Sequence, residues 1–236
     1  MNDATRQLLE NLNALATGLF LLTAFGIVAM RQANACLNLF IVQSLLLAAS
    51  AALLGLRYDS SHLYGVALVN LISKPIIVPW LLRKTSPAEI YTRREIGQVL
   101  DIPISLTIAL ALVIAAYFVG VPLASAVAPQ FRGPNIPIGI AVLLLGAFTL
   151  TVRREALPLL IGLLVMENGA FLVGISIARD LGMLVELAIA TDGLIIVFIM
   201  GVLVRAVQKQ IGTTAVGALA SLKETTAGSE SDEAPL

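Results

Sequence analysis

Charged residues, cysteine and histidine are all scarce in this chain of 236 residues. Only 13% of its residues are charged, whereas a soluble domain carries about a quarter. Lysine plus arginine equals aspartate plus glutamate, at 15 each, so no basic excess indicates a nucleic-acid partner. The single Cys36 excludes an internal disulfide, an iron–sulfur site and a cysteine-based zinc site, and the single His62 excludes bis-histidine haem ligation.

Motifs that bind phosphate or perform catalysis are missing as well. The sequence has no glycine-rich phosphate loop, nucleophile triad or metal-binding cluster. We therefore expect no catalytic residues, no cofactor and no metal in this chain. The polar first 13 residues do not predict a secretory signal peptide, and the acidic tail is typical of a disordered segment.

Apolar residues dominate instead, at 58% of the chain, with a mean hydropathy of +0.93. A helix that crosses a bilayer needs about 20 mainly apolar residues, and an open strand cannot satisfy its backbone in lipid. The sequence therefore predicts an all-α integral membrane protein with about seven transmembrane helices. The expected spans are 12–30, 36–56, 62–82, 102–120, 135–152, 156–178 and 182–204.

Lysine and arginine are distributed unequally over the links between these spans, and the long basic link 83–101 also allows a short surface helix. One side of the membrane receives ten of these residues and the other receives four. The ten are Arg31, Arg83, Lys84, Arg93, Arg94, Arg153, Arg154, Arg205, Lys209 and Lys223; the four are Arg6, Arg57, Arg132 and Arg179. Because cytoplasmic links are enriched in basic residues, we expect an outside N-terminus and a cytoplasmic C-terminus.

Two series of arginines recur at a spacing of 26 residues, and the second series follows the first after 122 residues. They are Arg31, Arg57 and Arg83, then Arg153, Arg179 and Arg205. Two parallel three-helix repeats, as in some transport proteins, explain this offset, which sets Asn70 opposite Asp192. Spans of similar length that end in arginine explain it equally. The expected units are 1–101, with the first three helices; 102–134, a connecting helix and outer loop; 135–212, with the last three helices; and 213–236, a partly disordered cytoplasmic tail.

Glu167 lies at the centre of the apolar run 156–178. A charged side chain costs roughly 2.5 kcal/mol or more at the bilayer centre, and such residues often belong to proton relays or ion paths. Asn168 adds a second polar group, and Gly169 allows another helix to approach closely. The alternative is a structural carboxylate that is paired to a neighbouring helix.

Two further carboxyl groups occur in the run 182–204. Asp192 lies near its middle among small residues, which favours a position inside the bundle. Glu186 lies six residues earlier and nearer the outer side. The pair is consistent with successive steps of a proton path, whereas interfacial carboxylates in contact with headgroup water are the alternative.

Lys74 is the basic residue expected at membrane depth, between Ser73 and Pro75 in the run 62–82. Pro75 and Pro79 should loosen this helix because proline removes backbone hydrogen bonds. A buried lysine either loses its charge or pairs with a carboxylate, and Glu167 or Asp192 is a candidate partner. The alternative is a lysine that extends to the interface, although Lys74 lies ten residues from Arg83. His62 and the pair Arg153-Arg154 are expected at the membrane surface.

Residues 140–223 resemble the small K subunit of respiratory complex I. The shared features are a span ending in Arg153-Arg154, the sequence Leu160-Ile161-Gly162-Leu163, a mid-helix glutamate beside Asn168, and a last span with an acidic residue that ends in Arg205. The whole chain resembles the hydrogenase-4 component E family, through Met166-Glu167-Asn168-Gly169, the segment from Glu186 to Asp192, and the segment from Leu219 to Lys223. This family contains membrane subunits of group 4 nickel–iron hydrogenases and formate hydrogenlyase-like complexes.

The resemblance implies a multi-pass subunit of the inner (plasma) membrane. It would lie in lipid beside antiporter-like and complex I-like membrane subunits and a peripheral hydrogenase or electron-transfer arm. It implies a lateral proton path, with Glu167 and Asp192 as principal carriers and Lys74 and Glu186 as further steps. One departure is that the K-subunit glutamate aligns with Leu164, one helical turn before Glu167, and Asp192 is only in approximate register.

The sequence thus predicts a non-catalytic membrane subunit that couples proton movement to electron transfer in partner subunits. Two alternatives remain open. A self-contained secondary transporter would move its substrate when purified alone into liposomes, and a scaffold subunit would tolerate neutral replacements of all its buried charges.

Overall fold

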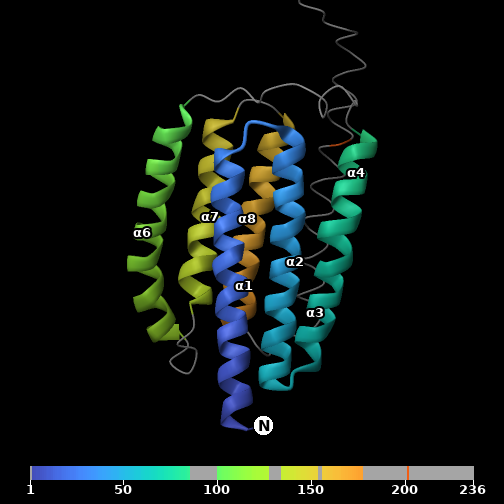
Figure 1. Ribbon diagram of the computed structural model, residues 1–236, viewed down its shortest axis with the longest axis vertical. Coiled ribbons are helices and arrows are strands. Elements are labelled where there is room, and N and C mark those ends of the chain that lie inside the picture. The colour runs from blue at the N-terminus through green and yellow to red at the C-terminus, as the bar shows by residue number, and fades with distance from the viewer. Residues whose placement is uncertain (1, 86–99, 128–133, 154–155, 178–200, 202–236) are drawn as a thin grey trace, which may run out of the picture.

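The computed structural model describes residues 2–85, 100–127, 134–153, 156–177 and 201, which are helical apart from short connections (Figure 1). No strand occurs in this part of the chain. The elements are α1 (Asp3–Ala29), α2 (Ala33–Tyr58), α3 (Ser61–Ile72), the π-helical η1 (Ser73–Ile77), α4 (Val78–Thr85), α6 (Ile102–Val127), α7 (Asn135–Val152) and α8 (Ala156–Ile177).

Six helical stretches in the described part are long and apolar enough to cross a membrane. They are Asp3–Ala29, Ala33–Tyr58, Ser61–Trp80, Ile102–Ala126, Asn135–Val152 and Leu157–Ile177. They match the first six expected spans and confirm the all-α class. The expected span 182–204, most of the basic link and the tail 213–236 lie outside the described residues, as do the second and third arginines of the later series.

Two helices are longer than their apolar runs. Helix α1 begins at Asp3 rather than at residue 12, and α6 continues past residue 120 to Val127, with Pro122 inside it. Both additions carry mostly exposed side chains, including Leu8. A hydropathy pattern finds the part of a helix that suits lipid, whereas the backbone hydrogen bonds continue beyond it.

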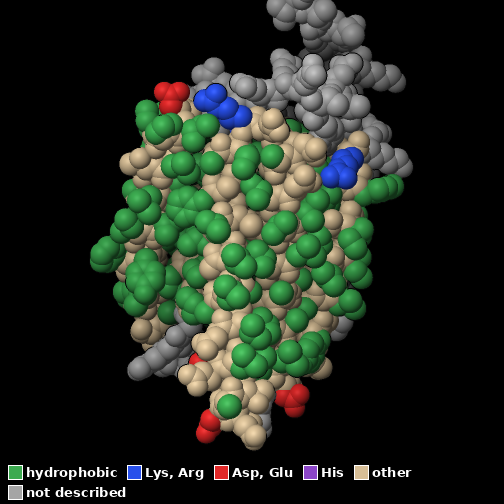
Figure 2. All heavy atoms as spheres, viewed as in Figure 1, with side chains coloured by type: hydrophobic (Ala, Val, Ile, Leu, Met, Phe, Trp, Pro, Cys, Tyr) green, Lys and Arg blue, Asp and Glu red, His purple; other side chains and the backbone are tan. Residues whose placement is uncertain are grey.

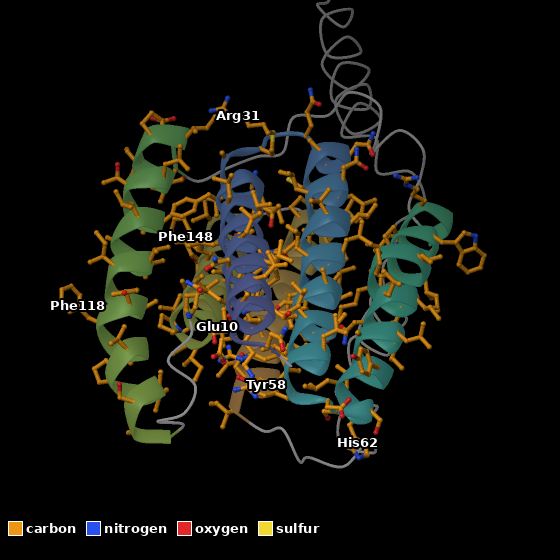
Figure 3. The ribbon with its side chains drawn as sticks, turned by 60° about the horizontal axis from the view of Figure 1, so that its bottom comes forward. Glu10, Arg31, Tyr58, His62, Phe118 and Phe148 are labelled. Atoms are coloured by element: carbon orange, nitrogen blue, oxygen red, sulfur yellow. The ribbon has the colours of Figure 1, made fainter. Side chains whose placement is uncertain are left out.

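The helices form a bundle in which consecutive spans run in opposite directions, with α3, η1 and α4 as one continuous rod (Figure 1). Helices α1, α2, α7 and α8 pack together, while α6 lies against α7 on one flank and α3 lies against α2 on the other. We call the end of the bundle with Glu10, Arg57 and His62 the N-terminal end, and the end with Arg31 and Arg153 the far end (Figure 3).

On the face shown in Figure 2, apolar side chains cover the middle of the bundle and charged side chains lie towards its two ends. Helix α6 is the most exposed of the spans, and Tyr117 and Phe118 on it are 61% and 75% exposed. Phe118 extends away from the bundle (Figure 3). A soluble protein would seldom expose so continuous an apolar surface, so the sides suit contact with lipid or with other membrane subunits.

Glycines allow α7 and α8 to pack in direct backbone contact. A methyl group added at Gly146 would lie 2.4 Å from the Met166 backbone nitrogen, and one added at Gly169 would lie 2.3 Å from the Leu143 nitrogen. Small residues at such crossings are the usual means of close association between membrane helices. The close approach expected of Gly169 is therefore confirmed, and it fixes the position of the neighbouring Glu167 and Asn168.

We expect Gly169→Ala to destabilise the protein by about 1–3 kcal/mol, because the added carbon must push α7 and α8 apart. Gly174→Ala on the same helix is the matched control, since no described atom lies within 4 Å of its added carbon. Denaturant unfolding of the purified protein in detergent compares the two variants. Equal stabilities would contradict the packing that we describe.

Arg153 differs from its expected position at the membrane surface, where it was expected to contact headgroups. Its side chain is only 4% exposed, and Nη2 donates hydrogen bonds to the carbonyl oxygens of Ile27, Val28 and Met30 at 3.0, 3.1 and 2.6 Å. The last carbonyls of a helix lack partners in their own helix, and a cation there also complements the helix dipole. Arg153 thus joins the end of α7 to the end of α1.

Arg153→Met should destabilise the protein by about 2–4 kcal/mol, because it removes the charged hydrogen bonds to the last carbonyls of α1. Arg31→Met, at an exposed arginine of the same end, should change the free energy of unfolding by less than about 0.5 kcal/mol. Thermal unfolding in detergent measures both. If Arg153→Met were as mild as Arg31→Met, the bond to α1 would not contribute to stability.

Candidate functional site

Lys74 lies near the midpoint of the third span, within the π-helical segment η1. Pro75 in this segment has no backbone N–H, and its ring disfavours the regular α-helical turn before it. The widened turn is the loosening that the two prolines predicted. Segments of π-helix inside α-helices are frequent at functional sites, where they change the direction of a side chain.

The ammonium group of Lys74 is almost entirely buried, with a side chain only 2% exposed. Its Nζ lies 3.0 Å from Oε1 of Glu167 and donates a hydrogen bond of 2.8 Å to Oδ1 of Asn168. The contact with Glu167 is an ion pair without good hydrogen-bond geometry at Oε1. Nζ also lies 5.1 Å from the centre of the Phe171 ring, a cation–π distance.

Asn168 connects this pair to α2. Its Nδ2 donates to Oε1 of Gln43 and to Oγ of Ser44, at 3.4 and 3.3 Å, while its Oδ1 accepts from Lys74. Asn168, Gln43 and Ser44 are all fully buried. Three elements therefore meet at one polar centre: α2, η1 and α8. We call Gln43, Ser44, Lys74, Glu167 and Asn168 the central cluster.

The structure brings together two of the four residues expected on a proton path, Lys74 and Glu167. Of the two carboxylates considered as partners of Lys74, Glu167 forms the ion pair, and the expectation of a buried rather than an interfacial lysine is confirmed. Asp192 and Glu186 lie outside the described residues. His62 is exposed at the N-terminal end, as expected (Figure 3).

A second buried polar group lies closer to the N-terminal end. Asn13 donates from Nδ2 to Oδ1 of Asn135 at 2.8 Å and accepts from the hydroxyl of Ser50 at 2.7 Å. Thr17, one turn further along α1, donates to the Asn13 carbonyl. We call Asn13, Thr17, Ser50 and Asn135 the outer cluster. Glu10 and Arg57 form an ion pair at the same end of the bundle.

Residue spacings in the sequence indicate both clusters, although neither spacing involves a charged residue at membrane depth. Gln43, Ser50 and Arg57 follow one another at seven residues, which places them on nearly one face of α2. Asn13 and Asn135 are separated by the same 122 residues as the two arginine series. An inspection limited to charged residues in apolar runs misses such uncharged amides and hydroxyls.

The central cluster places a basic and an acidic side chain in direct contact inside the bundle, 2% and 18% exposed respectively. Asn168 and the Phe171 ring complete the surroundings of the Lys74 ammonium. In the described part, no group of three or more His, Cys, Asp or Glu side chains could hold a metal ion.

Fold and site together define a class: a helical membrane protein with an ion pair at the middle of its bundle. Two kinds of curated relatives show which proteins of this class the chain is similar to. The chain is 26% identical over 209 residues to hydrogenase-4 component E of Escherichia coli (strain K12) and of Shigella flexneri, which covers 87% of this chain and 94% of the relative. An uncharacterized protein of Mycobacterium tuberculosis is 27% identical over 209 residues, or 89% of this chain and 94% of the relative.

These relatives confirm that the chain resembles the hydrogenase-4 component E family over nearly its whole length. No family model matches the chain. No solved structure matches it either.

Glu167→Gln should destabilise the protein by about 3–5 kcal/mol, because it leaves the buried Lys74 ammonium without its partner. Lys74→Met should cost less, because the Glu167 carboxylate that it leaves unpaired is 18% exposed. The double variant should lose less than the sum, with a coupling energy of about 0.5–3 kcal/mol. Unfolding in detergent measures the four proteins of this cycle. Strictly additive losses would contradict a direct interaction between the two charges.

The exposed pair of Glu10 and Arg57 is the control for this cycle. Their side chains are 47% and 29% exposed, so their coupling energy should stay below about 1 kcal/mol. A coupling as large as that of the buried pair would show that the method reports general destabilisation rather than the pair.

Proposed function

We propose that this chain is a non-catalytic membrane subunit of a hydrogenase-like or complex I-like assembly. It would provide a lateral proton path coupled to electron transfer in partner subunits. The observation that carries this proposal is the ion pair between Lys74 and Glu167, buried near the middle of two spans. The similarity to relatives named as hydrogenase components supports membership in such an assembly.

The ion pair suits a proton path because its two charges cancel. A proton that reaches Glu167 leaves a net positive charge at a depth where charge is expensive. This favours onward release of the proton to the next group. The Asn168 amide, which bonds to Gln43 and Ser44 on one side and to Lys74 on the other, holds the pair in place during the exchange.

Further steps of the path are assigned to Asp192 and Glu186. Both are mid-span or outer carboxyl groups of the run 182–204, and the resemblance to the K subunit supports a role for the acidic residue of this last span. Partner membrane subunits of the antiporter-like and complex I-like kinds would continue the path on either side. A peripheral hydrogenase or electron-transfer arm would provide the free energy.

We infer the following topology for the subunit: seven spans in the inner membrane, an outside N-terminus and a cytoplasmic C-terminus. The unequal distribution of lysine and arginine supports this orientation. With the described helices alternating in direction, Arg31 and Arg153 lie at the end that would face the cytoplasm.

Two parallel three-helix repeats, in units 1–101 and 135–212, are part of the same proposal, with 102–134 as a connection and 213–236 as a cytoplasmic tail. The helix boundaries are consistent with this repeat. Helix α7 ends at Val152, 123 residues after α1 ends at Ala29, and α8 begins at Ala156, 123 residues after α2 begins at Ala33. The hydrogen bond between Asn13 and Asn135 also supports the repeat. These residues are equivalent at the 122-residue offset, and equivalent residues of two repeats meet at the two-fold axis that relates the repeats.

Glu167→Gln in the assembled complex should lower electron-coupled proton transport by at least about tenfold, since each 1.4 kcal/mol added to a barrier slows a step tenfold. Transport is divided by the amount of assembled complex, because the same substitution also destabilises the chain. Glu10→Gln, at the exposed ion pair of the N-terminal end, is the matched control and should transport normally. Proton uptake by vesicles during turnover is the measurement.

Normal coupled transport by an intact Glu167→Gln complex would overturn the proton path. Retained assembly and activity after neutral replacement of Lys74, Glu167 and Asp192 together would indicate a scaffold. Transport by the purified chain alone in liposomes would indicate a self-contained transporter. Running the assay with sodium absent separates proton from sodium movement.

A further inference from the structure

The buried polar side chains lie unevenly along the bundle. From the N-terminal end, the pair of Glu10 and Arg57 comes first, then the outer cluster, and then the central cluster. On α2 these levels are marked by Arg57, Ser50 and Gln43, each about 10 Å from the next along the helix. Hydrogen bonds between side chains of different helices occur at both buried levels.

The half of the bundle between the central cluster and the far end is apolar. Its fully buried side chains include Phe20, Leu37, Phe40, Leu145, Ile161 and Leu164, each at most 1% exposed. Its buried hydroxyls on Thr23 and Thr149 bond to carbonyls of their own helices. Among the described residues, no hydrogen bond joins two buried side chains of different helices in this half, and Arg153 bonds to backbone at its end.

Among the described residues, two buried polar atoms in or beside the central cluster lack partners, whereas Oγ of Ser105, which also lacks one, lies near the start of α6, a helix that packs against α7 and α1. Nε2 of Gln43 and Oδ1 of Asn70 have no hydrogen-bond partner in the described part of the chain, and both residues are at most 1% exposed. Asn70 lies about one turn from Lys74, towards the N-terminal end. A buried donor and a buried acceptor without protein partners are the usual setting of an internal water molecule.

We infer that water reaches the pair of Lys74 and Glu167 from the N-terminal end only, along the outer cluster and through sites at Gln43 and Asn70. Among the described residues, the apolar half provides no chain of polar side chains from the pair to the far end. This inference rests on the proposed function, because it names the side of the membrane with which the pair exchanges its proton. It assigns Asn13, Ser50 and Asn135 to the route, residues that carry no charge.

Thiol protection by silver ions tests the route, since Ag⁺ is small, hydrophilic and reacts with thiols. Ser50 and Cys36 provide a matched pair: each lies seven residues from Gln43 on α2, in opposite directions, and they are 0% and 1% exposed. The test compares Ser50→Cys in a Cys36→Ser background with the parent chain. The assembled complex is used in sealed vesicles, and Ag⁺ is added from one side at a time.

Thiols that remain free are counted with a fluorescent maleimide after denaturation. His62→Cys and Arg31→Cys, both at exposed positions of the two ends, establish which side of the vesicle each end faces. Thr17→Cys is a second probe of the route, because the Thr17 hydroxyl bonds only to carbonyls of its own helix and its replacement breaks no bond between helices.

We expect Ag⁺ to protect Ser50→Cys and Thr17→Cys from the side on which it protects His62→Cys, and at least about tenfold faster than it protects Cys36 from either side, since thiol reactivity follows access to water. If Ag⁺ protected Cys36 but did not react with Ser50→Cys or Thr17→Cys, the route would lie at the far end instead. Equal reaction of all three, or of none, would equally overturn the inference.

The result separates this inference from the proposed function, because no step of the assay depends on proton transport. If the labelling pattern fails while Glu167→Gln abolishes coupling, the path stands and only its sidedness is wrong. If Glu167→Gln transports normally while the pattern holds, the interior is hydrated from one end but does not serve the proposed path.

Discussion

The burial of one ammonium group, that of Lys74, constrains the rest of the bundle. A lone charge at this depth is costly, so its neighbours must supply a counter-charge and a hydrogen-bond acceptor. Glu167 and Asn168 on α8 supply both. Because α8 must then sit within reach of η1, with α2 beside it, the placement of three elements follows from one interaction. Removing it would leave the polar groups of α2 and α8 facing apolar side chains.

Glycine packing makes this placement rigid. Gly146 and Gly169 bring the backbones of α7 and α8 into contact, so the turn of α8 that carries Glu167 cannot move without moving α7. At the far end Arg153 ties α7 to the carbonyls of α1. The charged pair is thus held by elements from both halves of the chain. A site that must shift charge without unfolding needs this kind of support.

Much of the fold could be predicted from the sequence because the bilayer demands long apolar helices, and six of these spans were found in their expected places. The partner of Lys74 was narrowed to two carboxylates for the same reason. Gln43, Ser50 and Asn135 were missed, since their spacing indicates a shared helix face or a repeat offset but not the partners to which they bond. Arg153 was assigned to the surface because a span end usually lies there, and only tertiary packing shows that it caps another helix.

The two proposed units contribute different chemistry to one site. At the 122-residue offset, Lys74 corresponds to Ile196, and Glu167 and Asn168 correspond to Leu45 and Leu46. Each charge therefore has an apolar counterpart in the other unit, whereas the amides of Asn13 and Asn135 face each other. In a duplicated chain, the amide contact could be kept in both units while one unit gained a base, Lys74, and the other an acid, Glu167. The two together form a neutral pair inside the bundle. Such a pair forms only when both units are folded against one another, so the ion pair depends on the integrity of the whole bundle.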